Sequence, residues 1–125
     1  MSEDRRLLKE FLAGFSRNMW ISFEGLDAYL RKSTRTVDGK LVPVFDIATV
    51  VGVPPYGRGR FSEWHAEVER TLADTPFKYL MLECVHNPII GEFAIRHGYR
   101  PYGADSYLKD LNEDHQPGSP SILRA

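Results

Sequence analysis

An apolar run, a glycine-rich turn, an amphipathic segment and a second apolar run follow one another in the middle of the chain. The first run is nearly continuous, which is typical of a strand buried on both faces. After the turn Pro54–Arg60, apolar residues at three- and four-residue spacing predict a helix from about Arg60 to Ala73, and Tyr79–Val85 predicts a second strand. Strand, helix and strand in this order imply a parallel pair with a right-handed crossover. The apolar residues of the first run are Val42, Val44, Phe45, Ile47, Val50 and Val51, and those of the helix are Phe61, Trp64, Val68 and Leu72.

The segment before this unit predicts a helix and a hairpin. Apolar residues at helical spacing favour an amphipathic helix over about residues 3 to 15. The pair Asp38-Gly39 is a strong hairpin signal and joins a strand Tyr29–Val37 to a strand Leu41–Val51. The short stretch Met19–Phe23 is compatible with either a strand or a helical turn.

The segment after the unit predicts one helix and a return to the sheet. Asn87 and Pro88 are typical of the N-cap and first position of a helix, and Gly98 is typical of its end. Tyr99–Tyr107 then predicts one or two final strands. We therefore expect an α/β (α+β) fold whose central mixed sheet is mostly antiparallel, with one parallel crossover and helices on both faces. Residues 1–111 form one domain in this prediction, and residues 112–125 form a flexible tail.

Composition excludes several classes of protein. A formal net charge of −1 gives no basic field for duplex nucleic acid. The single cysteine, Cys84, cannot form an intrachain disulfide, and the four histidines lack metal-ligand spacing. No signal peptide or membrane-spanning stretch is indicated, which favours a cytoplasmic protein without a metal, a nucleic-acid partner or a membrane partner. The oligomeric state cannot be predicted from the sequence.

The glycine turn is the clearest chemical clue. A strand that opens through glycines into a helix presents unpaired backbone N–H groups and the positive end of the helix dipole, and both favour phosphate. The turn has neither the Lys-Ser or Lys-Thr of a P-loop nor the spacing of a dinucleotide fingerprint. Two readings stay open: an anion site at the helix start, or a tight turn whose Arg58 and Arg60 are solvated.

Two stretches of the sequence resemble the signatures of the GNAT acetyltransferases. The stretch Val51–Phe61 is similar to the family's acetyl-CoA loop, and Leu82–Asn87 with Arg96–Arg100 is similar to its second signature. The resemblance covers roughly Leu41 to Gly103, and within the family the chain looks in particular like the small GNAT-like proteins of tailed bacteriophages. It implies that acetyl-CoA binds with its pantetheine along the first strand. The cofactor-binding residues implied are Val51, Val53, Tyr56, Gly57, Arg58, Gly59, Arg60, Phe61 and Asn87.

The resemblance implies acetyl transfer to a primary amine, for which a protein lysine or N-terminus is one candidate. The alternative is a catalytically degenerate phage protein of this fold that binds a host protein or serves in the virion. This alternative is favoured by Tyr56 and Phe61, which replace the usual Arg or Gln and the small final residue of the family's loop, and by Ala94, because many family members have there a tyrosine that protonates the leaving thiolate. Tyr99, Tyr102 or water are the possible replacements.

Two carboxylates are candidates for the general base. Glu83 lies in the second apolar strand and Asp46 in the first, and burial raises the pKa of such a group toward a useful range. The competing reading for each is a structural ion pair or hydrogen bond. Cys84 with His86 is compatible with a nucleophile pair, although a cysteine in an apolar strand is usually a small hydrophobic residue. The hairpin residues Arg31, Lys32 and Arg35 form either a basic patch for an acidic acceptor or a solvated face.

Overall fold

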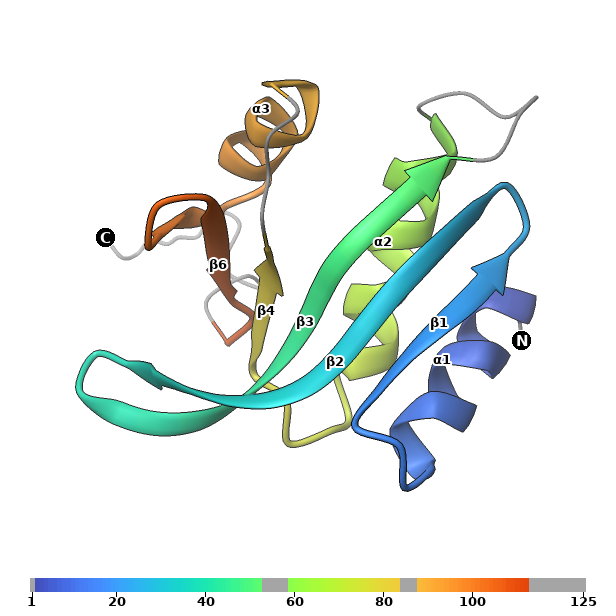
Figure 1. Ribbon diagram of the computed structural model, residues 1–125, viewed down its shortest axis with the longest axis horizontal. Coiled ribbons are helices and arrows are strands. Elements are labelled where there is room, and N and C mark those ends of the chain that lie inside the picture. Colours follow the sequence, from blue (N-terminus) through green and yellow to red (C-terminus); the bar gives the residue numbers. More distant parts are fainter. Residues whose placement is uncertain (1, 53–58, 84–87, 113–125) are drawn as a thin grey trace.

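The computed structural model describes residues 2–52, 59–83 and 88–112. The described residues form three helices and six strands (Figure 1). Their order is α1 (Glu3–Ala13), β1 (Asn18–Phe23), β2 (Leu26–Val37), β3 (Lys40–Gly52), α2 (Gly59–Leu72), β4 (Tyr79–Leu82), α3 (Pro88–Arg96), β5 (Arg100–Tyr102) and β6 (Ser106–Asp110).

Local chemistry explains where several of these elements begin and end. The Ser2 hydroxyl caps α1 by accepting a hydrogen bond from the Arg5 amide, and the helix stops at Ala13, two residues before its predicted end. The β2–β3 turn places Asp38 and Gly39 at φ values of 51° and 82°, as a tight hairpin turn requires. Gly98 follows α3 with φ at 88°, which confirms its predicted role.

The six strands form one sheet in the order β1-β2-β3-β4-β6-β5. Every neighbouring pair is antiparallel except β3 and β4, which are parallel and joined through α2. The predicted mixed sheet with one crossover is therefore confirmed. The stretch Met19–Phe23, which is compatible with two structures in the sequence, lies in strand β1.

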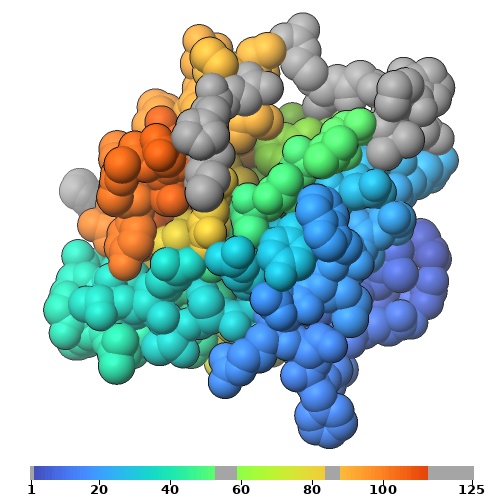
Figure 2. All heavy atoms as spheres, in the orientation of Figure 1, coloured from blue at the N-terminus to red at the C-terminus, as the bar shows by residue number. Residues whose placement is uncertain are grey.

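The two faces of the sheet are covered differently. On one, the helix face, residues of all three helices join a large apolar core with Phe45, Ile47 and Leu80 of the sheet. On the other, the outer face, the buried apolar cluster comes from strands alone: Val37, Val44, Met81 and Leu108. The sequence predicts helices on both faces, whereas the described helix residues in the core pack on the helix face. Figure 2 shows the outer face, with β1, β2 and β3 in the foreground.

The part of the chain that the structure describes contains no helix with the length and apolar character needed to cross a membrane.

Candidate functional site

The parallel strands β3 and β4 separate in the middle of the sheet. Their pairing runs from Val44 opposite Tyr79 to Ile47 opposite Leu82, and the Glu83 amide donates one more hydrogen bond of 3.1 Å to the Ile47 carbonyl. Strand β3 continues to Gly52 and remains paired with β2 on its other side. Among the described residues, no strand pairs with the β4 side of residues 48–52. The sheet therefore opens at this point, as Figure 1 shows.

Both predicted base candidates lie at the start of this opening. Asp46 on β3 and Glu83 after β4 share one arginine: the Arg35 Nη2 donates to Asp46 Oδ2 at 2.7 Å and also to Glu83 Oε2. The Ser33 hydroxyl donates to Asp46 Oδ2 at 3.1 Å, and Arg31 Nη1 donates to Glu83 Oε1 at 3.3 Å. We call these five residues the outer-face acid cluster.

The regular alternation of β2 places the donors of this cluster. Residues 31, 33 and 35 point to one face because successive side chains of a strand alternate. The hairpin register sets Arg31 directly opposite Asp46. Each residue of the predicted basic patch is partly exposed and has a partner: Arg31 and Arg35 pair with the acids, and Lys32 donates to the Phe11 and Gly14 carbonyls at 2.8 and 2.9 Å.

Asp46 has an unusual environment for a carboxylate. Its side chain is fully buried, and its Oδ1 has no hydrogen-bond partner in the described structure. Burial raises the pKa of Asp46 to about 7, with a further contribution from neighbouring Glu83, against the opposing effect of Arg35. Its carboxyl group is therefore protonated more readily than that of an exposed aspartate. Glu83 is the more accessible of the two acids, with 11% of its side chain exposed.

Helix α2 follows β3 in the sequence, and its first turn is the predicted phosphate site. Its residues are Gly59, Arg60 and Phe61, and this turn contains no acidic residue. The first amides of a helix have no partner within it and carry the positive end of the dipole. No described atom lies within 4 Å of the position that a Cβ on Gly59 would take, so an anion can approach this backbone.

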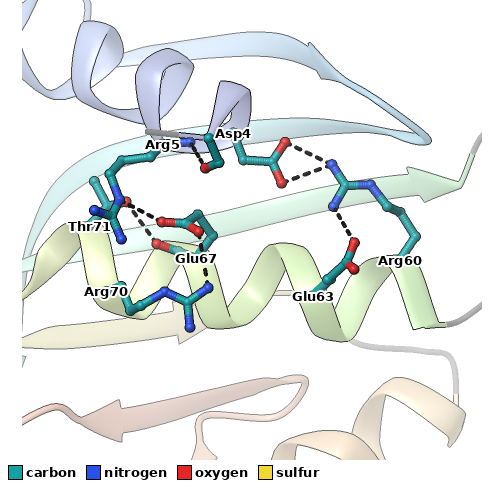
Figure 3. Close-up of polar contacts among 8 residues, drawn as sticks. Asp4, Arg5, Arg60, Glu63, Glu67, Arg70 and Thr71 are labelled. Atoms are coloured by element: carbon teal, nitrogen blue, oxygen red, sulfur yellow. Dashed lines mark hydrogen bonds and ion pairs between the residues drawn. The ribbon is translucent and has the colours of Figure 1, made fainter.

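Arg60 itself points toward α1 (Figure 3). Its Nη2 donates to both Asp4 carboxylate oxygens at 2.7 and 2.9 Å, its Nη1 to Glu63 at 3.3 Å, and its Nε to the Glu24 carbonyl. The groove beside it is lined by the carboxylates of Glu3, Asp4, Glu24 and Glu63, which repel a phosphate. Gly59 lines the same groove, so these acidic side chains lie beside the first amides of α2 and oppose an anion on that side.

Two other predicted cofactor residues, Phe61 of α2 and Val51 of β3, lie among the described residues. The Phe61 ring packs between α2 and α3, with its centroid 4.9 Å from that of Phe93 and 6.0 Å from that of Trp64. Val51 is 49% exposed near the end of β3, so burial on both faces is confirmed only for Val44–Ala48. The other predicted cofactor residues, Val53, Tyr56, Gly57, Arg58 and Asn87, lie outside the described residues, as do Cys84 and His86.

The hydroxyls of the two tyrosines that could replace the family's tyrosine at position 94 already contact other groups. Ala94 is fully buried in α3. The Tyr99 hydroxyl lies 2.6 Å from His65 Nε2, and the Tyr102 hydroxyl donates to the Thr36 carbonyl at 2.8 Å. Sequence reasoning missed Tyr107 of β6, whose hydroxyl would be 3.5 Å from a Cβ on Gly91 of α3. No local signal in the sequence brings these two residues together.

Comparison with solved structures identifies the fold. The KacTA–DNA complex matches with a TM-score of 0.58 at 16% sequence identity, over 74% of this chain and 62% of that chain. A mutant AtaT toxin bound to the C-terminus of the antitoxin AtaR and acetyl-CoA matches with a TM-score of 0.58 at 13% identity, over 72% of this chain and 61% of that chain. The fold is GNAT-like. No family model and no curated protein matches the sequence.

The matched part of this chain spans about three-fifths of each solved chain, 62% and 61%. At these identities the comparison concerns the fold alone.

Proposed function

We propose that this chain is an acetyl-CoA-dependent N-acetyltransferase acting on a primary amine, with Asp46 and Glu83 as its proton acceptors. The observation that carries the proposal is the buried Asp46, with a pKa near 7, beside Glu83 where the parallel strands of a GNAT-like fold separate. A general base works best when its pKa lies near the operating pH. A purely structural ion pair gains nothing from such a pKa.

The residues around the opening suit acetyl-CoA. The β4 side of residues 48–52, which pairs with no strand among the described residues, suits the amides of a pantetheine chain, and the first amides of α2 at Gly59, Arg60 and Phe61 suit a pyrophosphate. Acetyl-CoA, when bound, supplies an acetyl group activated as a thioester. We assign the phosphate contact to the α2 backbone rather than to the Arg60 side chain, because Asp4 and Glu63 already pair with that guanidinium.

The acid cluster supplies the proton chemistry. An alkyl amine is largely protonated at neutral pH and must lose a proton before it can attack. Glu83, the more exposed acid, receives this proton from the amine, and Asp46, which shares Arg35 with Glu83, holds it. Transfer then forms the amide C–N bond and breaks the C–S bond, and the nitrogen loses its second proton to the leaving thiolate, directly or through water. Ser33 and Arg35 fix the orientation of Asp46 throughout.

A second candidate is a protein of the same fold that binds a partner without acetyl transfer; in a bacteriophage, that partner would be a host protein or the virion. It is favoured by one observation: Ala94 offers no acid, and the hydroxyls of Tyr99 and Tyr102 are engaged elsewhere. The two candidates differ in whether acetyl-CoA is bound and consumed.

The test is binding and turnover of acetyl-CoA by the wild type and a matched pair of variants. Proline is tolerated at the first position of a helix but lacks the N–H, so Gly59→Pro removes one donor, whereas Gly59→Ala keeps it. Loss of one hydrogen bond to a charged group weakens binding by about 10- to 100-fold. We expect acetyl-CoA to raise the melting temperature of the wild type and Gly59→Ala, and much less that of Gly59→Pro. Absence of any shift and of thiol release with amines would favour the binding protein.

A further inference from the structure

A large aromatic residue is exposed on the outer face close to the acid cluster. Trp20 of β1 is 56% exposed and lies opposite Tyr29 of β2. Their ring centroids are 5.3 Å apart at an interplanar angle of 42°. The two rings form a small aromatic surface that is open to solvent, whereas the other tryptophan, Trp64, is fully buried.

Arg31 connects this aromatic surface to the acids. Its guanidinium carbon lies 5.4 Å from the centroid of the Tyr29 ring, and its Nη1 lies 3.3 Å from Glu83 Oε1. Contacts therefore run without interruption from Trp20 through Tyr29 and Arg31 to Glu83. We call these four residues the outer-face strip. The strip runs from β1 over β2 to the residue after β4, and so passes across β3.

The dimensions of the strip suit a small molecule. Strands β2 and β4 are separated by β3 alone, and neighbouring strands lie about 4.8 Å apart, so Tyr29 and Glu83 are about 10 Å apart. This is the span of an aromatic ring joined to an amine by a short alkyl chain. A polypeptide or a nucleic acid would extend well beyond it, and the net charge of −1 does not favour a polyanion.

We propose that the outer-face strip binds the acceptor and selects arylalkyl amines, with the aromatic ring on Trp20 and Tyr29 and the amine at Glu83. This inference rests on the proposed function, because it assigns a substrate class to the same site. The ring stacks on the two aromatic side chains and on the planar Arg31 guanidinium, while Glu83 attracts the ammonium group. Trp20 is thus a specificity-determining residue that does not touch the reacting atoms.

The kinetic test compares 4-phenylbutylamine with butylamine, which lacks the ring. Removing one aromatic contact changes binding by about three- to tenfold. We expect Trp20→Leu to raise the KM for 4-phenylbutylamine by this factor, to leave the KM for butylamine unchanged, and to leave kcat similar for both. Trp20→Phe should restore most of the loss. Phe15→Leu is the matched control, because Phe15 is fully exposed and makes no ring contact with the described residues. Equal effects on both amines would overturn the inference.

A binding test separates this inference from the proposed function. Excitation near 295 nm reports on the two tryptophans of the chain, and acrylamide quenches the exposed Trp20 in preference to Trp64. We expect 4-phenylbutylamine, and not butylamine, to protect Trp20 from quenching, whether or not acetyl-CoA is consumed. Protection of Trp20 without acetyl transfer would contradict the proposed enzyme activity and support the amine site on the outer-face strip. Acetyl transfer without protection would support the activity and contradict the amine site. Protection that depends on protein concentration, or that a single-stranded RNA oligonucleotide produces instead, would assign the strip to a second copy or to nucleic acid and overturn the inference.

Discussion

Two groups of ion pairs in this molecule use the same side-chain chemistry in different surroundings. Between α1 and α2, Asp4 and Glu63 pair with Arg60, and Glu67 pairs with Arg5 and Arg70 at 2.6 and 3.0 Å (Figure 3). On the outer face, Asp46 and Glu83 instead share Arg35.

The consequence is opposite for the two buried acids. Burial alone would raise the pKa of Glu67, but the hydrogen bonds from Arg70 and Arg5 outweigh it and lower the pKa. Burial of Asp46, with Glu83 beside it, outweighs Arg35 and raises the pKa to about 7. Glu67 thus has two arginines that no other buried acid of the described structure shares, whereas the more deeply buried Asp46 shares its one arginine with Glu83, and this difference accounts for the opposite pKa shifts.

The largest expected effect is on turnover by Asp46→Asn. An asparagine keeps the size of the side chain but cannot accept the proton, and positioned general bases contribute about 10²- to 10⁴-fold. We expect kcat for acetyl transfer to fall by at least about 100-fold, with little change in acetyl-CoA affinity. Steady-state kinetics with thiol detection measures this. Ser33→Ala is the control, since it removes one hydrogen bond to Asp46 and should cost far less; equal losses would contradict the assignment.

The second prediction concerns the pH dependence of stability. The pKa of Asp46 is higher in the folded state, about 7 against 3.8, so the stability it contributes is complete below pH 3.8 and is lost as the pH rises toward 7. His65 acts in the opposite direction, because burial lowers its pKa from 6.5 to about 3 and stability is lost as the pH falls through that range. Urea unfolding from pH 4 to 8 measures the unfolding free energy. In Asp46→Asn this free energy should no longer fall as the pH rises, and in His65→Gln it should no longer fall as the pH drops. Unchanged slopes would contradict these assignments.

The third prediction concerns the helix side of the comparison. Glu67→Gln removes the charge that faces Arg5 and Arg70 and leaves their donors poorly paired, which costs about 1–3 kcal/mol of unfolding free energy. Urea unfolding measures this cost, and kcat of the folded variant should stay unchanged. Glu10→Gln on the exposed side of α1 is the matched control and should cost less than about 0.5 kcal/mol.

The smallest expected effect is that of Arg60→Gln on acetyl-CoA binding. The guanidinium is engaged by Asp4, Glu63 and the Glu24 carbonyl, so its loss should lower the unfolding free energy by about 1–2 kcal/mol. We expect the Kd for acetyl-CoA, measured by calorimetry, to change less than it does in Gly59→Pro. A larger loss of affinity in Arg60→Gln would indicate that this side chain leaves Asp4 and contacts the phosphates.

The sequence predicted the fold from signals that are local. The Asp38-Gly39 turn needs positive φ values that few other residue pairs adopt, so it marks the hairpin. The order of strand, glycine turn, helix and strand predicts the one parallel crossover of the sheet. Counting back from the Asp38-Gly39 turn also pairs Arg31 with Asp46, so part of the acid cluster could have been found from the hairpin alone. Asp46 and Glu83 were both named because a carboxylate in an apolar strand is a strong signal wherever it occurs.

The remaining site residues depend on contacts that sequence patterns do not encode. Arg60 meets Asp4 across 56 positions of the chain, so its charge predicted a phosphate contact rather than an ion pair. The same holds for Arg35 with Glu83, 48 positions apart, and for Tyr107 beside Gly91. Periodicity places a side chain on a face, but packing between elements decides its partner.

The most direct test of the account is acetyl transfer and stability measured on one matched pair, Glu83→Gln and Glu67→Gln. Each variant neutralises a partly buried glutamate that bonds two arginines. The account predicts that Glu83→Gln stays folded and loses acetyl transfer from acetyl-CoA by about 100-fold or more, whereas Glu67→Gln is less stable and keeps its kcat. Full activity in Glu83→Gln, or no acetyl transfer by the wild type, would contradict it.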